Sequence, residues 1–203
     1  MISESTIIEV KQYTNELLIS LDHKYLFHNW NHTQEVVRVS MELGKQCGLS
    51  EKDLSILKVA AYFHDTGHVK SYTNHEEMSA RIAAEFLEIR DVAKEEIETV
   101  KSLILSTKLT SPCLTTMQEI LHDADLSHIG TLDMERRAKA LRKEWEYLLG
   151  SKYSEREWLE LQISFLSHLR FLTEPAKIKF EPILKIHIGH MKKKLFDLSS
   201  KEK

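Results

Sequence analysis

Histidine is concentrated in one part of this sequence, and its spacing there suggests metal or acid–base chemistry. The chain has 203 residues and 11 histidines, and eight of these lie between positions 23 and 128. Two pairs stand four residues apart, His28 with His32 and His64 with His68. If those segments are helical, each pair lies on one face of its helix. Imidazole side chains grouped in this way can bind a metal ion or move a proton.

Carboxylates accompany these histidines. Asp65 follows His64 directly, and a second His-Asp pair, His122 with Asp123, is followed closely by Asp125. A single His-Asp dipeptide arises easily by chance, so each pair must be judged by its neighbours. Imidazole and carboxylate donors together suit Mn, Fe, Co, Zn, Ni or Mg, and the helices of a bundle can bring them together. Spacing alone does not decide between Asp123 and Asp125.

Helices must position these groups, because the sequence contains few helix breakers and no sustained alternation of apolar and polar residues. It has six glycines and three prolines. We therefore expect an all-α protein with essentially no sheet. The patterns predict helices at about 5–21, 32–46, 51–63, 75–87, 94–107, 115–127, 133–149, 154–172 and 178–196. Ser50 and Asn74 are the expected N-caps of the third and fourth of these helices.

Length and composition fit a compact helical domain with a helical extension. Hydrophobic residues make up 42% and charged residues 29% of the chain, a balance that excludes a disordered chain. Histidine becomes rare after Leu132 while the helical pattern continues. We therefore expect the histidine-bearing domain, including an N-terminal helix, at residues 1–131, and a C-terminal helical extension packed on it at residues 132–203.

Charge and the N-terminal sequence bear on partners and location. The net charge of −3 provides no basic field for a nucleic-acid polymer. No apolar run reaches the length of a membrane span, and the first residues lack the basic start and apolar stretch of a secretory signal. Cys47 and Cys113 show no metal-type pairing and are expected to be reduced thiols. We expect a cytoplasmic protein that acts on a small molecule; assembly into a homo-oligomer stays open.

Three local motifs resemble the HD superfamily of metal-dependent phosphohydrolases. They are FHNWNH at residues 27–32, HDTGH at 64–68 and ADLS at 124–127. Their order and local sequence are similar to those of the cyclic-nucleotide phosphodiesterase branch, and residues 61–80 also look like small bacterial HD hydrolases. The resemblance covers about residues 23–130. Because Leu-Ser follows Asp125, the resemblance favours Asp125 over Asp123 as the metal ligand.

The resemblance implies an HD-domain helical bundle and a metal-dependent hydrolase. The substrate would be a phosphomonoester or phosphodiester in a nucleotide-like small molecule, and a metal-activated water would be the nucleophile. One or two divalent cations would be bound, with Asp65 bridging them. The implied metal ligands are His32, His64, Asp65 and Asp125.

The same resemblance assigns catalytic roles. His28 would protonate the leaving group, and Asp65 and His68 would complete the catalytic set. His68, His75 and Glu76 are weaker candidates for ligands of a second metal or for orienting its waters. The segment from Asn74 to Glu77 also suits the first turn of a helix, so His75 and Glu76 have a structural interpretation as well.

Two other functions stay open. The same donors could hold two irons that activate oxygen, and this site would require His68 and His75 as further nitrogen ligands. Alternatively, the domain could be a non-hydrolytic sensor or adaptor that binds a nucleotide. The complete set of metal donors favours the hydrolase over the sensor.

Overall fold

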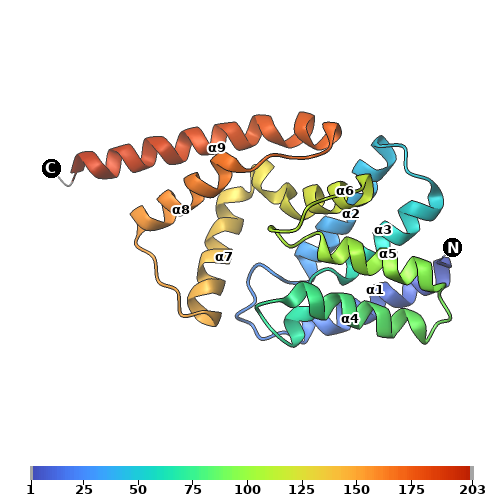
Figure 1. Ribbon diagram of the computed structural model, residues 1–203. Coiled ribbons are helices and arrows are strands. Elements are labelled where there is room, and N and C mark those ends of the chain that lie inside the picture. Colours follow the sequence, from blue (N-terminus) through green and yellow to red (C-terminus); the bar gives the residue numbers. More distant parts are fainter. Residues whose placement is uncertain (1, 202–203) are drawn as a thin grey trace.

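The computed structural model describes residues 2–201, and within this range the chain forms nine α-helices and two 3-10 helices without a strand (Figure 1). The predicted all-α fold is therefore confirmed. No helix in this range combines the length and the apolar character needed to cross a membrane. The elements are α1 (Glu4–Ile19), α2 (Trp30–Gln46), α3 (Glu51–Phe63), η1 (Thr66–Val69), α4 (His75–Glu88), α5 (Lys94–Leu105), α6 (Thr116–Asp125), η2 (Leu126–Gly130), α7 (Met134–Leu148), α8 (Glu155–His168) and α9 (Glu174–Lys201).

Each predicted helix is present, although several ends differ. Ser50 caps α3 as expected, because its Oγ accepts a hydrogen bond from the backbone N–H of Asp53 at 3.2 Å. Asn74 is the N-cap residue of α4, as expected, but its side chain makes no capping hydrogen bond. Asn74 instead adopts the left-handed backbone conformation (φ 57°), which asparagine tolerates better than most residues. The helix expected at 115–127 ends at Asp125 and continues as η2.

The four-residue spacing of the histidine pairs does not place either pair on one helical face. Asn29 caps α2 by accepting from the backbone N–H of His32 at 3.3 Å, so His28 lies in the loop before the helix. α3 ends before the second pair, and His68 lies in η1. The histidines therefore approach one another because the chain leaves its helices at these points, and not because of helical periodicity.

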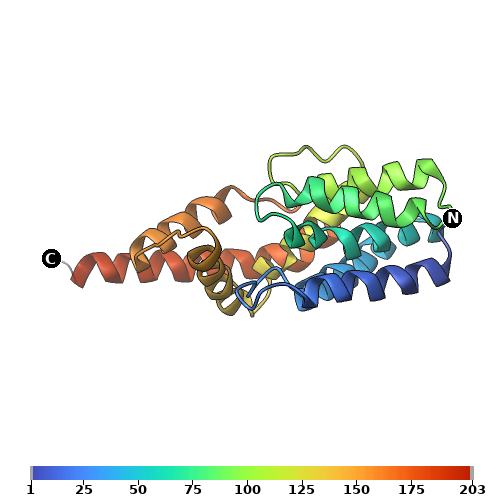
Figure 2. The same ribbon diagram turned by 90° about the horizontal axis from the view of Figure 1, so that it is seen from below.

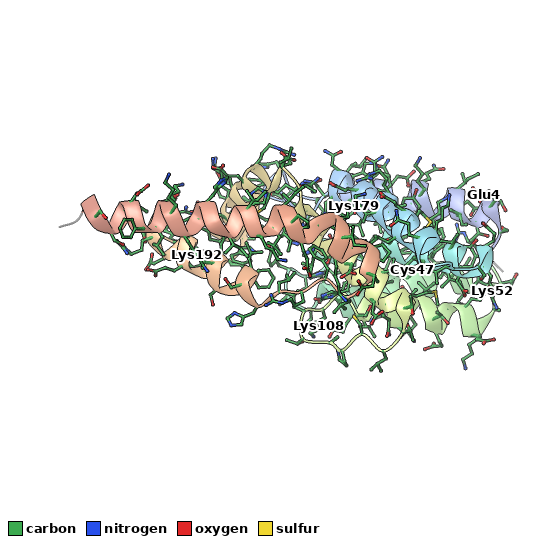
Figure 3. The ribbon with its side chains drawn as sticks, turned by 90° about the horizontal axis from the view of Figure 1, so that it is seen from above. Glu4, Cys47, Lys52, Lys108, Lys179 and Lys192 are labelled. Atoms are coloured by element: carbon green, nitrogen blue, oxygen red, sulfur yellow. The ribbon has the colours of Figure 1, made fainter. Side chains whose placement is uncertain are left out.

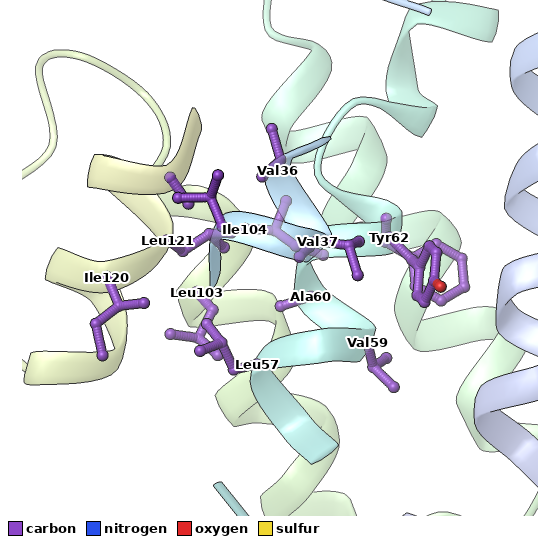
Figure 4. Close-up of a cluster of buried hydrophobic side chains, with 14 of the residues drawn as sticks. Val36, Val37, Leu57, Val59, Ala60, Tyr62, Leu103, Ile104, Ile120 and Leu121 are labelled. Carbon is purple, nitrogen blue, oxygen red and sulfur yellow. The ribbon is translucent and has the colours of Figure 1, made fainter. Parts of the chain in front are cut away.

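The core of the bundle forms where α2, α3, α5 and α6 meet (Figure 4). α3 is the central element, and every residue from 59 to 68 is buried. Fully burying an aliphatic side chain contributes about 1.5–3 kcal/mol, so this core fixes the end of α3 firmly. The buried residues labelled in Figure 4 are Val36, Val37, Leu57, Val59, Ala60, Tyr62, Leu103, Ile104, Ile120 and Leu121.

The C-terminal helices α7, α8 and α9 join the bundle at one end and project away from it. The N-terminus and the C-terminal end of α9 lie at opposite ends of the molecule (Figure 2). Lys179 lies over the bundle and Lys192 lies on the projecting half of α9 (Figure 3). Near the junction, a Cβ on Gly130 would lie 2.4 Å from the Cβ of Phe180. Glycine therefore lets η2 and α9 pack closely, and Phe180 belongs to the main core.

Candidate metal centre

The turn after α3 carries the His64-Asp65 pair inside the protein. His64 is fully buried, and its Nδ1 lies 2.8 Å from the carbonyl oxygen of Ala61. Because a carbonyl oxygen only accepts hydrogen bonds, Nδ1 carries the proton. In the neutral ring, Nε2 then presents its lone pair to the interior of the bundle.

Three elements bring one group of donors together at this point. His32 from α2, His64 after α3 and Asp125 at the end of α6 each offer a ligand atom, and these atoms lie within 4.8 Å of one another. The Nε2 atom of His32 lies 3.0 Å from Oδ1 of Asp125, and Nε2 of His64 lies 3.6 Å from the same oxygen. The Oδ2 atom of Asp65 lies 3.2 Å from Nε2 of His64 and 3.6 Å from Nε2 of His32.

The other oxygen of Asp65 faces a second group of imidazoles. Its Oδ1 lies 3.5 Å from Nε2 of His75 and 3.9 Å from Nε2 of His68. His28, Asp65 and His68 also each offer a ligand atom within 4.8 Å of the others. The two oxygens of Asp65 thus face two separate groups of nitrogen atoms, which is the arrangement required of a carboxylate that bridges two cations.

Several buried donors in this region lack hydrogen-bond partners among the described residues. They are Nε2 of His64, Oδ2 of Asp65 and both ring nitrogens of His68. Leaving such groups unpaired costs free energy, and the lone pair of Nε2 faces a carboxylate oxygen. A divalent cation would satisfy these atoms together, and the mixed nitrogen and oxygen donors suit several first-row metals. The residues therefore fit a bound divalent cation.

The charges in the cluster favour a cation. Burial opposes ionisation of both His64 and Asp65, but each group's charge favours that of the other, so the pKa of His64 is raised and the pKa of Asp65 is held well below its usual range. A cation bound at Nε2 would take the place of the proton that His64 carries there. The pKa of Asp125 is lowered in the same way, against its burial, by the hydrogen bond to His32 and by the neighbouring His64. Burial and the neighbouring His28 lower the pKa of His68 to about 2, so this imidazole stays neutral and able to donate a lone pair.

The structure separates Asp125 from Asp123. Asp123 is fully buried and faces the connection between α8 and α9. Its Oδ1 accepts from the backbone N–H of Leu172, and its Oδ2 accepts from the backbone N–H and the Oγ1 hydroxyl of Thr173, each at 2.8 Å. Asp123 therefore anchors the extension to α6, whereas Asp125 lies among the histidines.

His75 and Glu76 occupy different positions relative to the cluster. His75 reaches Asp65 with its Nε2, whereas Glu76 lies 3.7 Å from the opposite nitrogen, Nδ1, of the same ring. The close packing of α4 on η1 brings His75 near. The backbone N–H of Gly67 donates to Oγ of Ser79 at 2.8 Å, and a Cβ on Gly67 would lie 2.0 Å from the carbonyl oxygen of His75. The glycine of the HDTGH motif therefore permits the close packing of α4 on η1.

Sequence reasoning missed Glu144 of α7, which is fully buried beside His28. Its Oε2 accepts from the backbone N–H groups of Phe27 at 2.7 Å and of His28 at 3.1 Å. Its Oε1 accepts from Nδ1 of His28, and also from the Tyr72 hydroxyl at 3.0 Å. Glu144 thus fixes both the backbone and the ring of His28. The sequence offered no signal for this role, because Glu144 and Glu146 flank Trp145 symmetrically.

Protonation of His28 follows from this contact. Burial alone would lower its pKa, but the hydrogen bond to Glu144 and the charge of Asp65 outweigh burial, and the pKa of His28 is raised. Burial would raise the pKa of Glu144, yet the same bond lowers it. The pair therefore keeps its proton on His28, with Nδ1 engaged and Nε2 available for another partner.

Comparisons with known proteins agree with this geometry. The family model of the HD domain matches residues 29–130, which is half of the chain and contains His32, His64, Asp65 and Asp125. A search of curated proteins gave no match. Among solved structures, a Lactobacillus plantarum protein is 15% identical, with a TM-score of 0.74 over 98% of this chain and 100% of its own.

Two further structures share the fold. A predicted HD superfamily hydrolase from an uncultured Thermotogales bacterium is 19% identical, with a TM-score of 0.62 over 94% of this chain and 92% of its own. Bacillus subtilis YpgQ, solved in complex with ADP, is 16% identical, with a TM-score of 0.68 over 95% of each chain. At such identities the structures establish the fold alone, whereas the family model covers the motifs themselves. The chain therefore belongs to the HD domain family.

Proposed function

We propose that this protein hydrolyses a phosphomonoester or phosphodiester in a nucleotide-like small molecule with the help of one or two divalent cations. The cations would be held by His32, His64, Asp65 and Asp125. The observation that carries this proposal is the position of Asp65, whose two oxygens face separate groups of imidazole nitrogens at 3.2–3.9 Å. The unpaired Nε2 atom of buried His64 supports it.

The surrounding residues prepare these donors for their role. A divalent cation bound here would bring the pKa of a water molecule close to neutrality and neutralise charge on the phosphate oxygens. The carbonyl oxygen of Ala61 fixes the ring of His64 so that Nε2 points inwards. The ionised carboxylates of Asp65 and Asp125 supply the negative charge that balances a divalent cation.

His28 is proposed as the general acid. Glu144 holds its Nδ1–H, which leaves Nε2 to give a proton to the leaving oxygen of the substrate. The ring of His68 lies 4.6 Å from that of His28, centroid to centroid. Since His68 stays neutral, we assign it to the second cation or its water, together with His75. Glu76 contacts His75 on the side away from Asp65, so we assign it at most an orienting role.

A nucleotide is the substrate class that we favour. YpgQ, which shares the fold over 95% of each chain, was solved in complex with ADP. The net charge of −3 fits a small anionic substrate held by bound cations better than a polymer held by a basic surface.

One observation keeps a second candidate function in view. The second donor group contains His28 and His68, and His75 lies 3.5 Å from the same oxygen of Asp65. Two irons with several nitrogen ligands could be held by these residues, and such a centre could activate oxygen. Consumption of oxygen by the iron-loaded protein would identify this chemistry, because hydrolysis of a phosphoester uses no oxygen.

The test combines elemental analysis of the purified protein with a panel of nucleotides and generic phosphoesters under Mn, Mg, Co and Fe(II). We expect bound metal and phosphate release that Asp65→Ala abolishes. Asp197→Ala, at an exposed position on the projecting end of α9, is the matched control and should behave like the wild type. Nucleotide binding without turnover under every metal would instead indicate a sensor and contradict the proposal.

A further inference from the structure

An apolar cavity of about 220 Å³ adjoins the candidate metal centre. Its walls come from both parts of the chain: Phe27 and His128 belong to the bundle, Trp145 to α7 and Trp158 to α8. Leu109, on the connection between α5 and α6, contributes a further side. The walls are almost entirely apolar, in contrast to the charged cluster beside them.

Phe27 connects the cavity to the cluster. Its ring centroid lies 4.8 Å from that of His28 and 4.9 Å from that of His32. The ring of His128, which also lines the cavity, lies 4.9 Å from that of Phe27 and 6.2 Å from that of His32. The cavity is therefore separated from the proposed metal ligands by a single layer of side chains. The organic group of a phosphoester whose phosphate lies at the cluster would have to reach this cavity past the rings of Phe27 and His128.

The walls and the volume indicate the kind of group that fits. Four aromatic side chains line the cavity: Phe27, Trp145, Trp158 and Phe165. Flat apolar rings pack well against such walls, whereas a charged or heavily hydroxylated group would lose its hydrogen bonds to water without replacement. An apolar cavity of about 150 Å³ in another protein takes up benzene, so a volume of about 220 Å³ has room for one ring system.

We propose that this cavity binds a planar aromatic group of the phosphoester that is hydrolysed at the metal centre. This inference rests on the proposed function and specifies its substrate: a phosphoester with an aromatic ring, recognised by stacking and shape. The ring's polar edge would face the open rim, where Leu109 is 60% and Phe165 is 41% exposed. Ring systems of similar size should therefore be accepted with little discrimination.

The first test measures binding of 4-fluorobenzyl alcohol, an aromatic probe without phosphate, by fluorine NMR on the full-length protein. Ala138→Phe on α7 places a ring inside the cavity, and Ala140→Phe, on the same helix and also half-buried, is the matched control because Ala140 does not line it. We expect Ala138→Phe to weaken binding at least about tenfold, the loss of one stacked ring, and Ala140→Phe to leave it unchanged. Equal affinity in both variants would overturn the inference.

A second variant keeps the test conclusive if Ala138→Phe does not fold. Phe165→Ala removes one aromatic wall at the half-exposed rim and should also weaken binding of the probe about tenfold. Thermal unfolding and metal content of each variant should match the wild type. Unchanged affinity in a folded Phe165→Ala protein would contradict aromatic recognition.

The second test links the cavity to catalysis. Ala138→Phe should raise the KM for 4-fluorobenzyl phosphate about tenfold and leave that for glycerol phosphate unchanged. An equal change for both esters would overturn the connection between cavity and substrate. Binding of the probe needs neither metal nor turnover. A failure of the proposed aromatic site can therefore be told apart from a failure of the proposed hydrolase function. Binding that responds to Ala138→Phe while no phosphoester is hydrolysed would contradict the proposed function and support the ring site.

Discussion

The bundle of α1–α6 and the C-terminal helices α7–α9 contribute different things to the candidate site. The bundle with its loops supplies the clustered donors, on α2, after α3 and at the end of α6. The C-terminal helices supply no member of the two donor groups, yet they provide Glu144, which holds His28, and the two tryptophans of the cavity. On the proposals above, the bundle would hold the metal, whereas the C-terminal helices would position the general acid and supply part of the aromatic cavity.

Two buried carboxylates join these regions in opposite directions. Asp123 of the bundle accepts hydrogen bonds from the backbone of Leu172 and Thr173 in the extension. Glu144 of the extension accepts hydrogen bonds from the backbone of Phe27 and His28 in the bundle. Hydrogen bonds to charged groups contribute about 1.5–3 kcal/mol each, so each of these two carboxylates holds one region against the other.

The largest effect is expected from Asp65→Ala, which tests the proposed binding of metal by the bundle. This carboxylate faces both donor groups, and the variant should lose bound metal and hydrolysis together; His64→Ala should act likewise. Metal content by elemental analysis and phosphate release measure the two losses, with Asp197→Ala as the control. An Asp65→Ala protein with full metal content and full turnover would show that this pair is not the metal site.

His28→Ala should have the next largest effect, and it should depend on the substrate. A general acid typically contributes about 10²- to 10⁴-fold to the rate. The variant should keep its metal while slowing cleavage of an ester with a poor alkoxide leaving group. An ester of p-nitrophenol should lose far less rate, because its phenolate leaves without a proton. Loss of metal would make His28 a ligand, since it belongs to the second donor group; equal slowing of both esters would make it a positioning residue.

Glu144 tests the contribution of the extension. Replacing a residue that orients a metal ligand through a hydrogen bond typically costs about 10- to 100-fold, and we expect a loss of the same order for a residue that orients the general acid. Glu144→Gln should lower kcat more than it raises KM, with a larger loss for poor leaving groups and with metal retained. Glu144→Ala should be slower still, because the N–H groups of Phe27 and His28 lose their acceptor. Glu146→Gln, two residues along the same helix, is the control. A loss that is equal for all leaving groups would contradict positioning of His28.

The sequence predicted the parts of this structure that depend on local signals. Helix positions follow from apolar periodicity and from capping residues such as Ser50, which act within one turn. The motif at 64–68 could be recognised because it is a contiguous stretch that resembles a known family; its Gly67 lies where a Cβ would meet the backbone of His75. The HD domain assignment, which rested on such motifs, is confirmed by the family model.

The remaining features depend on contacts between distant segments. Glu144 lies 116 residues from His28, and no local pattern separates it from Glu146. The orientations of Asp123 and Asp125 depend on where α6 gives way to η2, and this boundary could not be placed from periodicity. The i, i+4 argument for the histidine pairs failed because Asn29 starts α2 after His28.

The smallest effect on turnover is expected from Asp123→Asn, which weakens the hydrogen bonds between the bundle and the extension but leaves the proposed metal donors unchanged. Asp123 accepts from Leu172 with one oxygen and from Thr173 with the other. An amide has one acceptor oxygen, so the substitution places an NH₂ group against a backbone N–H and loses at least one bond. The cost should be about 1–3 kcal/mol, which lowers Tm by about 2–4 °C per kcal/mol in a protein of this size. Metal content should stay near that of the wild type, whereas Asp125→Asn should lose metal. Loss of metal in Asp123→Asn and its retention in Asp125→Asn would assign the ligand to Asp123. An unchanged Tm in Asp123→Asn would show that the hydrogen bonds of Asp123 do not stabilise the fold.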